Sequence, residues 1–331
     1  MRIINRHTAR LNRIGTSPFL ALSLLIAGVA GCSTLGDRGK QLVPTNHQFR
    51  TGPFLFSSDF ELKKDSPVVL SLESLEREVA KTLDLDAIPS DPTIEIYILN
   101  DRDSFSHFLR FYYPELPTRR AFFLAQGESR VVYTFMGPKL EEDLRHEATH
   151  ALLNLRFGDL PLWLDEGLAE YFEVVSPADA GSQEHLDKLP ADLAGGWKPE
   201  LGRLEALADI RQMTPGDYRE SWAWVYALLN QNLAGKSTLL AYLRETPTSR
   251  SETKLAARLA RNGSGLNGES LVAYMNSLRN RHMTQSQATP KARTVRFQDR
   301  GPDAAQAIEP PSPQKGIFKG FFRRVGSLFG L

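Results

Sequence analysis

The sequence predicts an α+β fold, in which a small mixed β-sheet leads into a helix carrying the motif H-E-x-x-H and a mostly helical C-terminal half follows. Apolar and polar residues alternate at strand spacing within residues 93–135. Apolar residues then recur at helical spacing, first from residue 140 and later in the stretches 218–229, 236–246, 251–262 and 267–281. A length of 331 residues with 41% hydrophobic content suits one large globular domain or two small ones.

The charge balance argues against one class of partner. The formal net charge is +1, so no bulk electrostatic attraction favours a nucleic acid. We therefore expect no nucleic-acid partner.

The first 31 residues have the pattern of a secretory signal peptide. Four arginines precede an apolar run from Phe19 to Ala30, which is too short to span a bilayer comfortably. The segment ends in Val-Ala-Gly-Cys32, which resembles a bacterial lipobox and implies that Cys32 is lipidated. Because Ser33, not Asp, follows that cysteine, we expect a cell-envelope lipoprotein on the periplasmic face of the outer membrane. Cys32 is the only cysteine, which excludes a disulfide within the chain and a cysteine-based zinc site.

Composition divides the rest of the chain into four parts. Residues 32–66 are polar and predict a tether, within which four phenylalanines either form a short strand or pack on the domain edge: Phe49, Phe54, Phe56 and Phe60. Residues 67–283 predict the globular domain. Residues 284–314 are rich in Pro and polar residues and predict a disordered linker.

The last part, residues 315–331, predicts a basic amphipathic helix. Its apolar side chains gather on one face and Lys319, Arg323 and Arg324 lie off that face. Three docking sites remain open for it: an anionic lipid surface, the groove of a partner protein, or the chain's own domain.

Four elements are expected before the motif helix. Leu70–Leu85 predicts a helix with Ser71 as a possible cap, and Thr93–Leu99 predicts a strand. Asp101–Tyr113 predicts a second helix. Ala121–Phe135 predicts a hairpin, because a Gly-Glu-Ser turn separates two apolar arms.

The motif helix carries the residues with the clearest chemistry. His146 and His150 are four positions apart, so on a helix both rings project from one face. Two neutral imidazoles at this spacing can hold a zinc ion while Glu147 acts as general base toward a zinc-activated water. Glu141, Glu142 and Asp143 suit the helix N-terminus, and Gly158 is placed to end the helix.

The motif and the stretch Trp163–Tyr171 together resemble the gluzincin metallopeptidases, a group that includes thermolysin. The most similar patterns are the aminopeptidase N type and the bacterial peptidase MA-like proteins, and the resemblance covers roughly residues 68–245. It implies that Glu166 is the third zinc ligand beside His146 and His150. Glu170, one helical turn later, is either an alternative third ligand or a carboxylate that accepts the ring N–H of a ligand histidine. A third possibility for Glu170 is a solvated helix carboxylate.

The resemblance also suggests two substrate contacts. Aminopeptidase-N-type enzymes have a tyrosine before an apolar helix that donates a hydrogen bond to the oxyanion. The match places this role on Tyr218, for which a packing role is the alternative. Asp217 is expected to cap that helix. An edge strand that pairs with extended substrate would correspond to Arg130–Met136, although an internal strand without substrate contact is equally open. No G-A-M-E-N-like segment precedes the motif helix, so endopeptidase and exopeptidase action both stay open.

The remaining histidines show no ligand pattern. Ser176–Gly202 predicts a long polar loop that could serve as a lid, with His185 as one of its surface residues. His47 is expected at the surface and His282 at the solvated edge of the domain, whereas His107 is expected on a helix, either packed or exposed.

The sequence thus predicts a zinc-dependent peptidase of the cell envelope, with a peptide or protein as substrate. Two alternatives remain open: a catalytically inactive, zinc-stabilised binding or scaffold lipoprotein, and a peptidoglycan-related amidase that uses the same site.

Overall fold

A computed structural model describes residues 43–86, 91, 93–114, 116–176, 182–245 and 253–288. Cys32, the predicted signal peptide, the amphipathic segment 315–331 and most of the predicted linker lie outside these residues. The described part has the predicted α+β architecture, and up to Ser286 it belongs to one compact unit.

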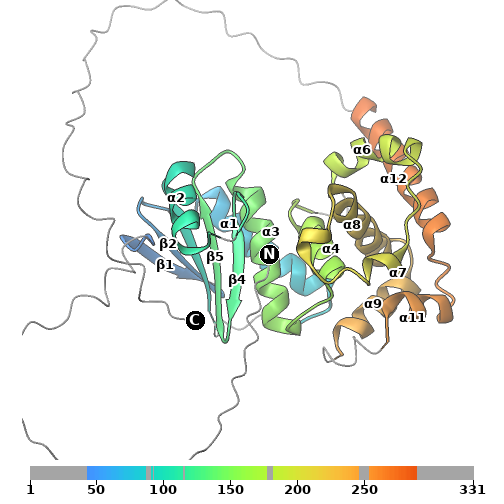
Figure 1. The fold of residues 1–331 in the computed structure, drawn as a ribbon, viewed down its shortest axis with the longest axis horizontal. Coiled ribbons are helices and arrows are strands. Elements are labelled where there is room, and N and C mark those ends of the chain that lie inside the picture. Colours follow the sequence, from blue (N-terminus) through green and yellow to red (C-terminus); the bar gives the residue numbers. More distant parts are fainter. Residues whose placement is uncertain are drawn as a thin grey trace, which may run out of the picture. The chain divides into compact units, whose positions relative to one another are not determined.

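A five-stranded mixed sheet forms the first layer of this unit (Figure 1). Its strands follow the order β1-β2-β3-β5-β4, in which β2, β3 and β5 are parallel neighbours and β1 and β4 are antiparallel edge strands. The bounds are β1 (His47–Thr51), β2 (Phe54–Ser58), β3 (Ile94–Leu99), β4 (Phe122–Gln126) and β5 (Ser129–Phe135). The predicted strand and hairpin are therefore confirmed.

Within the predicted tether of residues 32–66, the alternative of a short strand is confirmed from His47 to Ser58, where the chain forms β1 and β2. Phe54 and Phe56 are 0% and 1% exposed, because alternate residues of β2 face the main core. Burial of two phenylalanines outweighs the polar composition around them. The domain accordingly begins some twenty residues before its predicted start.

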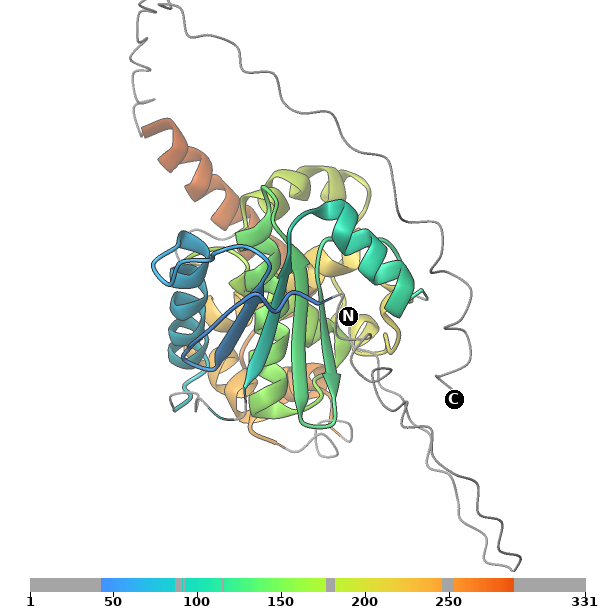
Figure 2. The same cartoon turned by 90° about the vertical axis from the view of Figure 1, so that its left-hand side faces the viewer.

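Helices cover both faces of the sheet (Figure 2). Helices α1 (Pro67–Thr82) and α3 (Leu140–Phe157) pack on the face that contains Ile94, Ile96 and Ile98. Helix α2 (Arg102–Tyr112) packs on the opposite face. It begins with the side chain of Asp101 accepting from the backbone N–H of Ser104. Helix α1 has Ser66 at its N-cap and Pro67 in its first turn, so the predicted cap at Ser71 is wrong, and Ser71 is buried.

The second half of the unit is helical. It contains α4 (Leu162–Phe172), α6 (Gln183–Ala194), α7 (Leu201–Leu204), the short η2 (Ile210–Gln212), α8 (Pro215–Asn230), α9 (Leu233–Leu243), α11 (Leu255–Arg261) and α12 (Gly268–Ala288). Helix α12 continues five residues into the segment predicted as linker. No helix in the described ranges combines the length and apolar character needed to span a membrane.

The predicted loop from Ser176 to Gly202 is wrong where α6 and α7 form. Ser182 caps α6 by accepting from the backbone N–H of His185, and Leu186 and Leu189 are buried on its inner side. Pro190 lies inside the helix and obscured the helical pattern in the sequence. Helix α6 therefore belongs to the packed domain.

Helices α4 and α8 cross closely at Gly167. A Cβ atom at this position would lie 2.6 Å from the carbonyl oxygen of Ser221, nearer than two such atoms can approach. The glycine is required by this contact between two helix backbones, which fixes α4 against the helical half.

Replacing Gly167 with Ala should lower the free energy of unfolding by about 1–3 kcal/mol, because the added methyl group forces the two helices apart. Urea unfolding followed by circular dichroism measures the loss. Gly202→Ala is the matched control, since no atom lies within 4 Å of the position that its Cβ would take, and it should leave the unfolding midpoint nearly unchanged. Equal midpoints for both variants would contradict the close crossing.

Candidate metal centre

Three potential metal ligands converge between α3 and α4. The Nε2 atoms of His146 and His150 lie 3.6 Å and 3.7 Å from Oε2 of Glu166. Ligands bound tetrahedrally at zinc distances are roughly 3.3 Å apart, so small side-chain movements would bring these atoms onto one ion. Two imidazoles and a carboxylate also form the donor set of many catalytic zinc sites. The residues present therefore fit a zinc ion.

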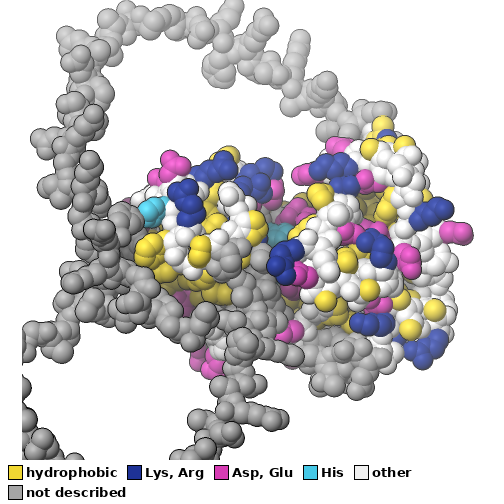
Figure 3. Space-filling model, in the orientation of Figure 1, with side chains coloured by type: hydrophobic (Ala, Val, Ile, Leu, Met, Phe, Trp, Pro, Cys, Tyr) yellow, Lys and Arg dark blue, Asp and Glu magenta, His cyan; other side chains and the backbone are white. Residues whose placement is uncertain are grey.

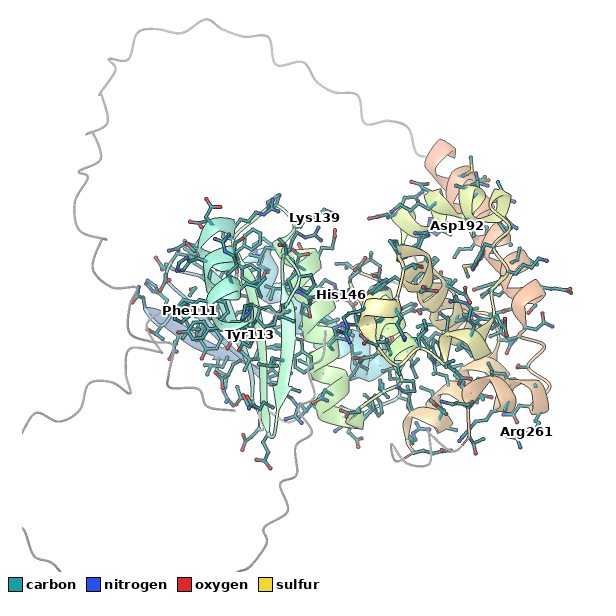
Figure 4. All side chains as sticks on the ribbon, viewed as in Figure 1. Phe111, Tyr113, Lys139, His146, Asp192 and Arg261 are labelled. Carbon is teal, nitrogen blue, oxygen red and sulfur yellow. The ribbon has the colours of Figure 1, made fainter. Side chains whose placement is uncertain are left out.

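The backs of both helices are anchored in the core. Leu144, Ala148 and Leu152 on α3 are 0% exposed, and so are Trp163 and Leu164 on α4. Gly158, with φ 64°, ends α3 and allows the chain to turn into α4. Packing thus sets the spacing of the ligands before any metal binds. Figure 4 shows His146 projecting from α3 toward the helical half.

Carboxylates on α4 and at its C-cap contact the outer nitrogens of both histidines. Nδ1 of His146 lies 3.2 Å from Oε2 of Glu173. A proton on Nδ1, donated to Glu173, would leave the Nε2 lone pair directed at the centre. Oδ2 of Asp165 is 3.1 Å from Nδ1 of His150, within ion-pair distance but at an angle that does not make a hydrogen bond. One of the roles predicted for Glu170, accepting the ring N–H of a ligand histidine, is therefore taken by Glu173.

The electrostatics of the centre favour a cation. Burial alone would lower the pKa of His146, but its contacts with Glu166 and Glu173 outweigh burial and raise that pKa well above its usual value. Burial would raise the pKa of Glu166, but His150 and His146 hold it below its usual range. His146 is thus stabilised in its charged form by carboxylates, and a divalent ion could take the place of its proton.

Glu147 has a carboxylate oxygen with no hydrogen-bond partner among the described residues. Its side chain is buried, and the oxygen without a hydrogen-bond partner is Oε2. A buried acceptor of this kind points to a donor that the protein itself does not supply. Glu147 lines the same cleft as His146 and Glu166, so that donor would lie beside the metal ligands.

The cleft has a volume of about 440 Å³ and lies between the sheet side and the helical half (Figure 3). The segment Thr118–Ala121, which leads into β4, lines one side, and Ile210 and Tyr218 line the other. Burial, followed by Glu166 and Glu170, raises the pKa of Tyr218. Its hydroxyl therefore stays protonated and can donate a hydrogen bond into the cleft.

Tyr218 reaches the cleft from the first turn of α8. Thr214 is the N-cap of this helix, and Asp217 completes a capping box by accepting from the Thr214 backbone N–H. The predicted cap at Asp217 is thus wrong by three residues, although Asp217 does stabilise the helix start.

His185 was missed as a neighbour of the site. Its Nε2 lies 2.8 Å from Oε2 of Glu170, and its ring packs against Trp222 with centroids 4.9 Å apart. Its side chain is only 10% exposed, which corrects the predicted surface position. Ser182 is a favoured N-cap residue, which was the available signal that His185 lies on a helix. His47 is exposed, as predicted, His107 is exposed as well, and His282 is partly buried on α12.

The edge strand beside the cleft is β4. Strand β5, which contains most of the predicted substrate strand Arg130–Met136, lies between β3 and β4 and has both edges paired. A substrate strand cannot pair there, so the edge-strand prediction is wrong and the alternative of an internal strand is confirmed. The hairpin folds back so that its first arm, not its second, is exposed at the edge.

No protein-family model matches this chain, and a search of the curated proteins gives no match either.

Proposed function

We propose that this chain is a zinc-dependent peptidase. The observation that supports the proposal most strongly is the convergence of His146, His150 and Glu166 beside the unpaired carboxylate oxygen of Glu147. A zinc ion held by these three ligands would act as a Lewis acid that acidifies water and polarises a carbonyl group.

The residues around the centre suit peptide-bond hydrolysis. Glu147 takes a proton from the attacking water, whose oxygen bonds to the carbonyl carbon. The C–N bond then breaks, and Glu147 returns the proton to the leaving amine. Tyr218 donates a hydrogen bond to the oxyanion that develops, a contact typically worth about 2–4 kcal/mol in the transition state. The substrate is a peptide or protein, and the exposed edge of β4 offers backbone groups for an extended chain.

The location proposed for the enzyme is the cell envelope. Lipidation at Cys32 would anchor the chain to the membrane, and the segment 315–331 would provide a second contact with lipid. Both features come from the sequence alone, because they lie outside the described residues.

Metal content tests the ligand set. The full chain purified in detergent should bind about one zinc per molecule, and Glu166→Ala should lose it because a three-ligand site rarely tolerates removal of a ligand. Glu170→Ala should keep its zinc. Inductively coupled plasma mass spectrometry on dialysed protein gives the stoichiometry.

Two other outcomes would change the proposal. Loss of zinc only in Glu170→Ala would show that the third ligand is Glu170, one turn further along α4, and not Glu166. A folded wild-type protein that binds no zinc would contradict the peptidase and leave a binding lipoprotein in its place.

A further inference from the structure

Two candidate ligand sets share His146. The first is His146, His150 and Glu166, and the second is His146, Glu170 and Glu173. Within each set the potential ligand atoms lie within 4.8 Å of one another. Glu170 and Glu173 also line the cleft that contains His146 and Glu166, so a metal at the first set would have two further carboxylates in the same cleft.

Each of these additional carboxylates has a partner that holds it. Glu173 contacts Nδ1 of His146. Glu170 is hydrogen-bonded to Nε2 of His185, which comes from α6. The ring of His185 is itself fixed by its contact with Trp222 on α8, and its backbone N–H bonds to the cap residue Ser182. The position of Glu170 thus depends on a side chain from a different helix.

We propose that His185 is a positioning residue that keeps Glu170 from coordinating the metal. A catalytic zinc site needs three protein ligands and one open position. A carboxylate released beside a divalent ion would be drawn to that ion and would fill the open position. The hydrogen bond from His185 opposes this movement and preserves the ligand set His146, His150 and Glu166. The inference rests on the proposed function, because it requires a metal at that set.

The effect should be specific to Glu170. Removing the His185 N–H leaves the contact between Glu173 and His146 in place, and it touches none of the three proposed ligands. The expected result is a protein that still binds metal but hydrolyses its substrate about tenfold to a hundredfold more slowly, the range typical of lost contacts around a metal site.

His185→Phe is the main variant, since it keeps a ring against Trp222 and removes the donor. The full chain is loaded with Co²⁺, whose visible spectrum reports coordination number, and hydrolysis is measured in parallel on the zinc form. His185→Phe should change the cobalt spectrum and slow hydrolysis. His185→Phe combined with Glu170→Ala should restore the spectrum and the rate of Glu170→Ala alone. His107→Phe, at an exposed position on α2, is the matched control and should behave as wild type.

The outcomes separate this inference from the proposed function. If wild type binds cobalt and His185→Phe has the same spectrum, the positioning role is wrong while the metal centre stands. If adding Glu170→Ala to His185→Phe does not restore the spectrum and the rate, the positioning role is also wrong. General structural damage caused by His185→Phe would persist in the double variant. Wild type that takes up no cobalt or zinc would overturn both. His185→Asn, too short to reach Glu170, gives the same test if His185→Phe does not fold.

Discussion

Replacing Glu147 with Gln should abolish hydrolysis and leave zinc bound. The amide has nearly the same size and shape as the carboxylate, but it cannot accept a proton from water. General-base catalysis typically contributes about 10²–10⁴-fold, and we expect a loss of that order in kcat. Because Glu147 is not among the three ligand candidates, the metal content should stay at the wild-type value. Hydrolysis rates on a fluorogenic peptide library test the loss of activity, and zinc measurements on the same sample test the unchanged metal content.

Glu141→Gln is the matched control for this substitution. It makes the same chemical change on the same helix, at an exposed position in the first turn. Its rate should equal that of wild type. A Glu147→Gln protein with full activity would contradict the proposed mechanism, and a wild type without hydrolysis of any peptide would favour the scaffold lipoprotein.

The geometry of the candidate ligands could be predicted because it depends on local spacing. The positions of His146 and His150 follow from the period of a helix, and Gly158 is a residue type that commonly ends a helix. Glu166 required the resemblance to a known pattern, since the sequence alone left Glu170 as an alternative. The structure brings Glu166 to both histidines and gives Glu170 another partner.

The parts that sequence reasoning missed depend on contacts between distant segments. Glu173 meets His146 only because α3 and α4 pack against each other, and His185 meets Glu170 only because α6 forms. The pairing of β2 with β3 likewise joins residues about 40 positions apart, so local composition gave no sign of it. Strand order was missed for the same reason, because a hairpin pattern does not state which arm has a further neighbour.

Arg145 is a further residue whose importance only the structure shows. Its side chain is 1% exposed, although arginine is rarely buried. It donates to the backbone carbonyls of Phe172, Glu173 and Val174 at the end of α4, and to the carbonyl of Ser71 on α1. It also forms an ion pair with Glu78, in which Nη2 of Arg145 lies 2.7 Å from Oε2 of Glu78. One guanidinium thus joins α3, which carries two of the ligand candidates, to the end of α4.

Arg145→Met should cost about 3–5 kcal/mol of unfolding free energy, because it breaks a partly buried ion pair and removes several buried hydrogen bonds at once. Methionine fills part of the volume but leaves Glu78 and four carbonyl groups without their donor. Urea unfolding of the metal-free protein measures this loss without the stabilisation that bound zinc would add. Arg110→Met, an exposed position on α2, should change the free energy by less than about 0.5 kcal/mol.

The same variant also connects stability to the site. The carbonyl groups that Arg145 binds follow directly on the turn that carries Glu170. Losing these hydrogen bonds should let Glu173 move away from His146 and should weaken zinc binding in the protein that remains folded. An Arg145→Met protein with wild-type stability and zinc affinity would show that core packing alone aligns α3 and α4. The hydrogen bonds of Arg145 would then be a consequence of that alignment and not its cause.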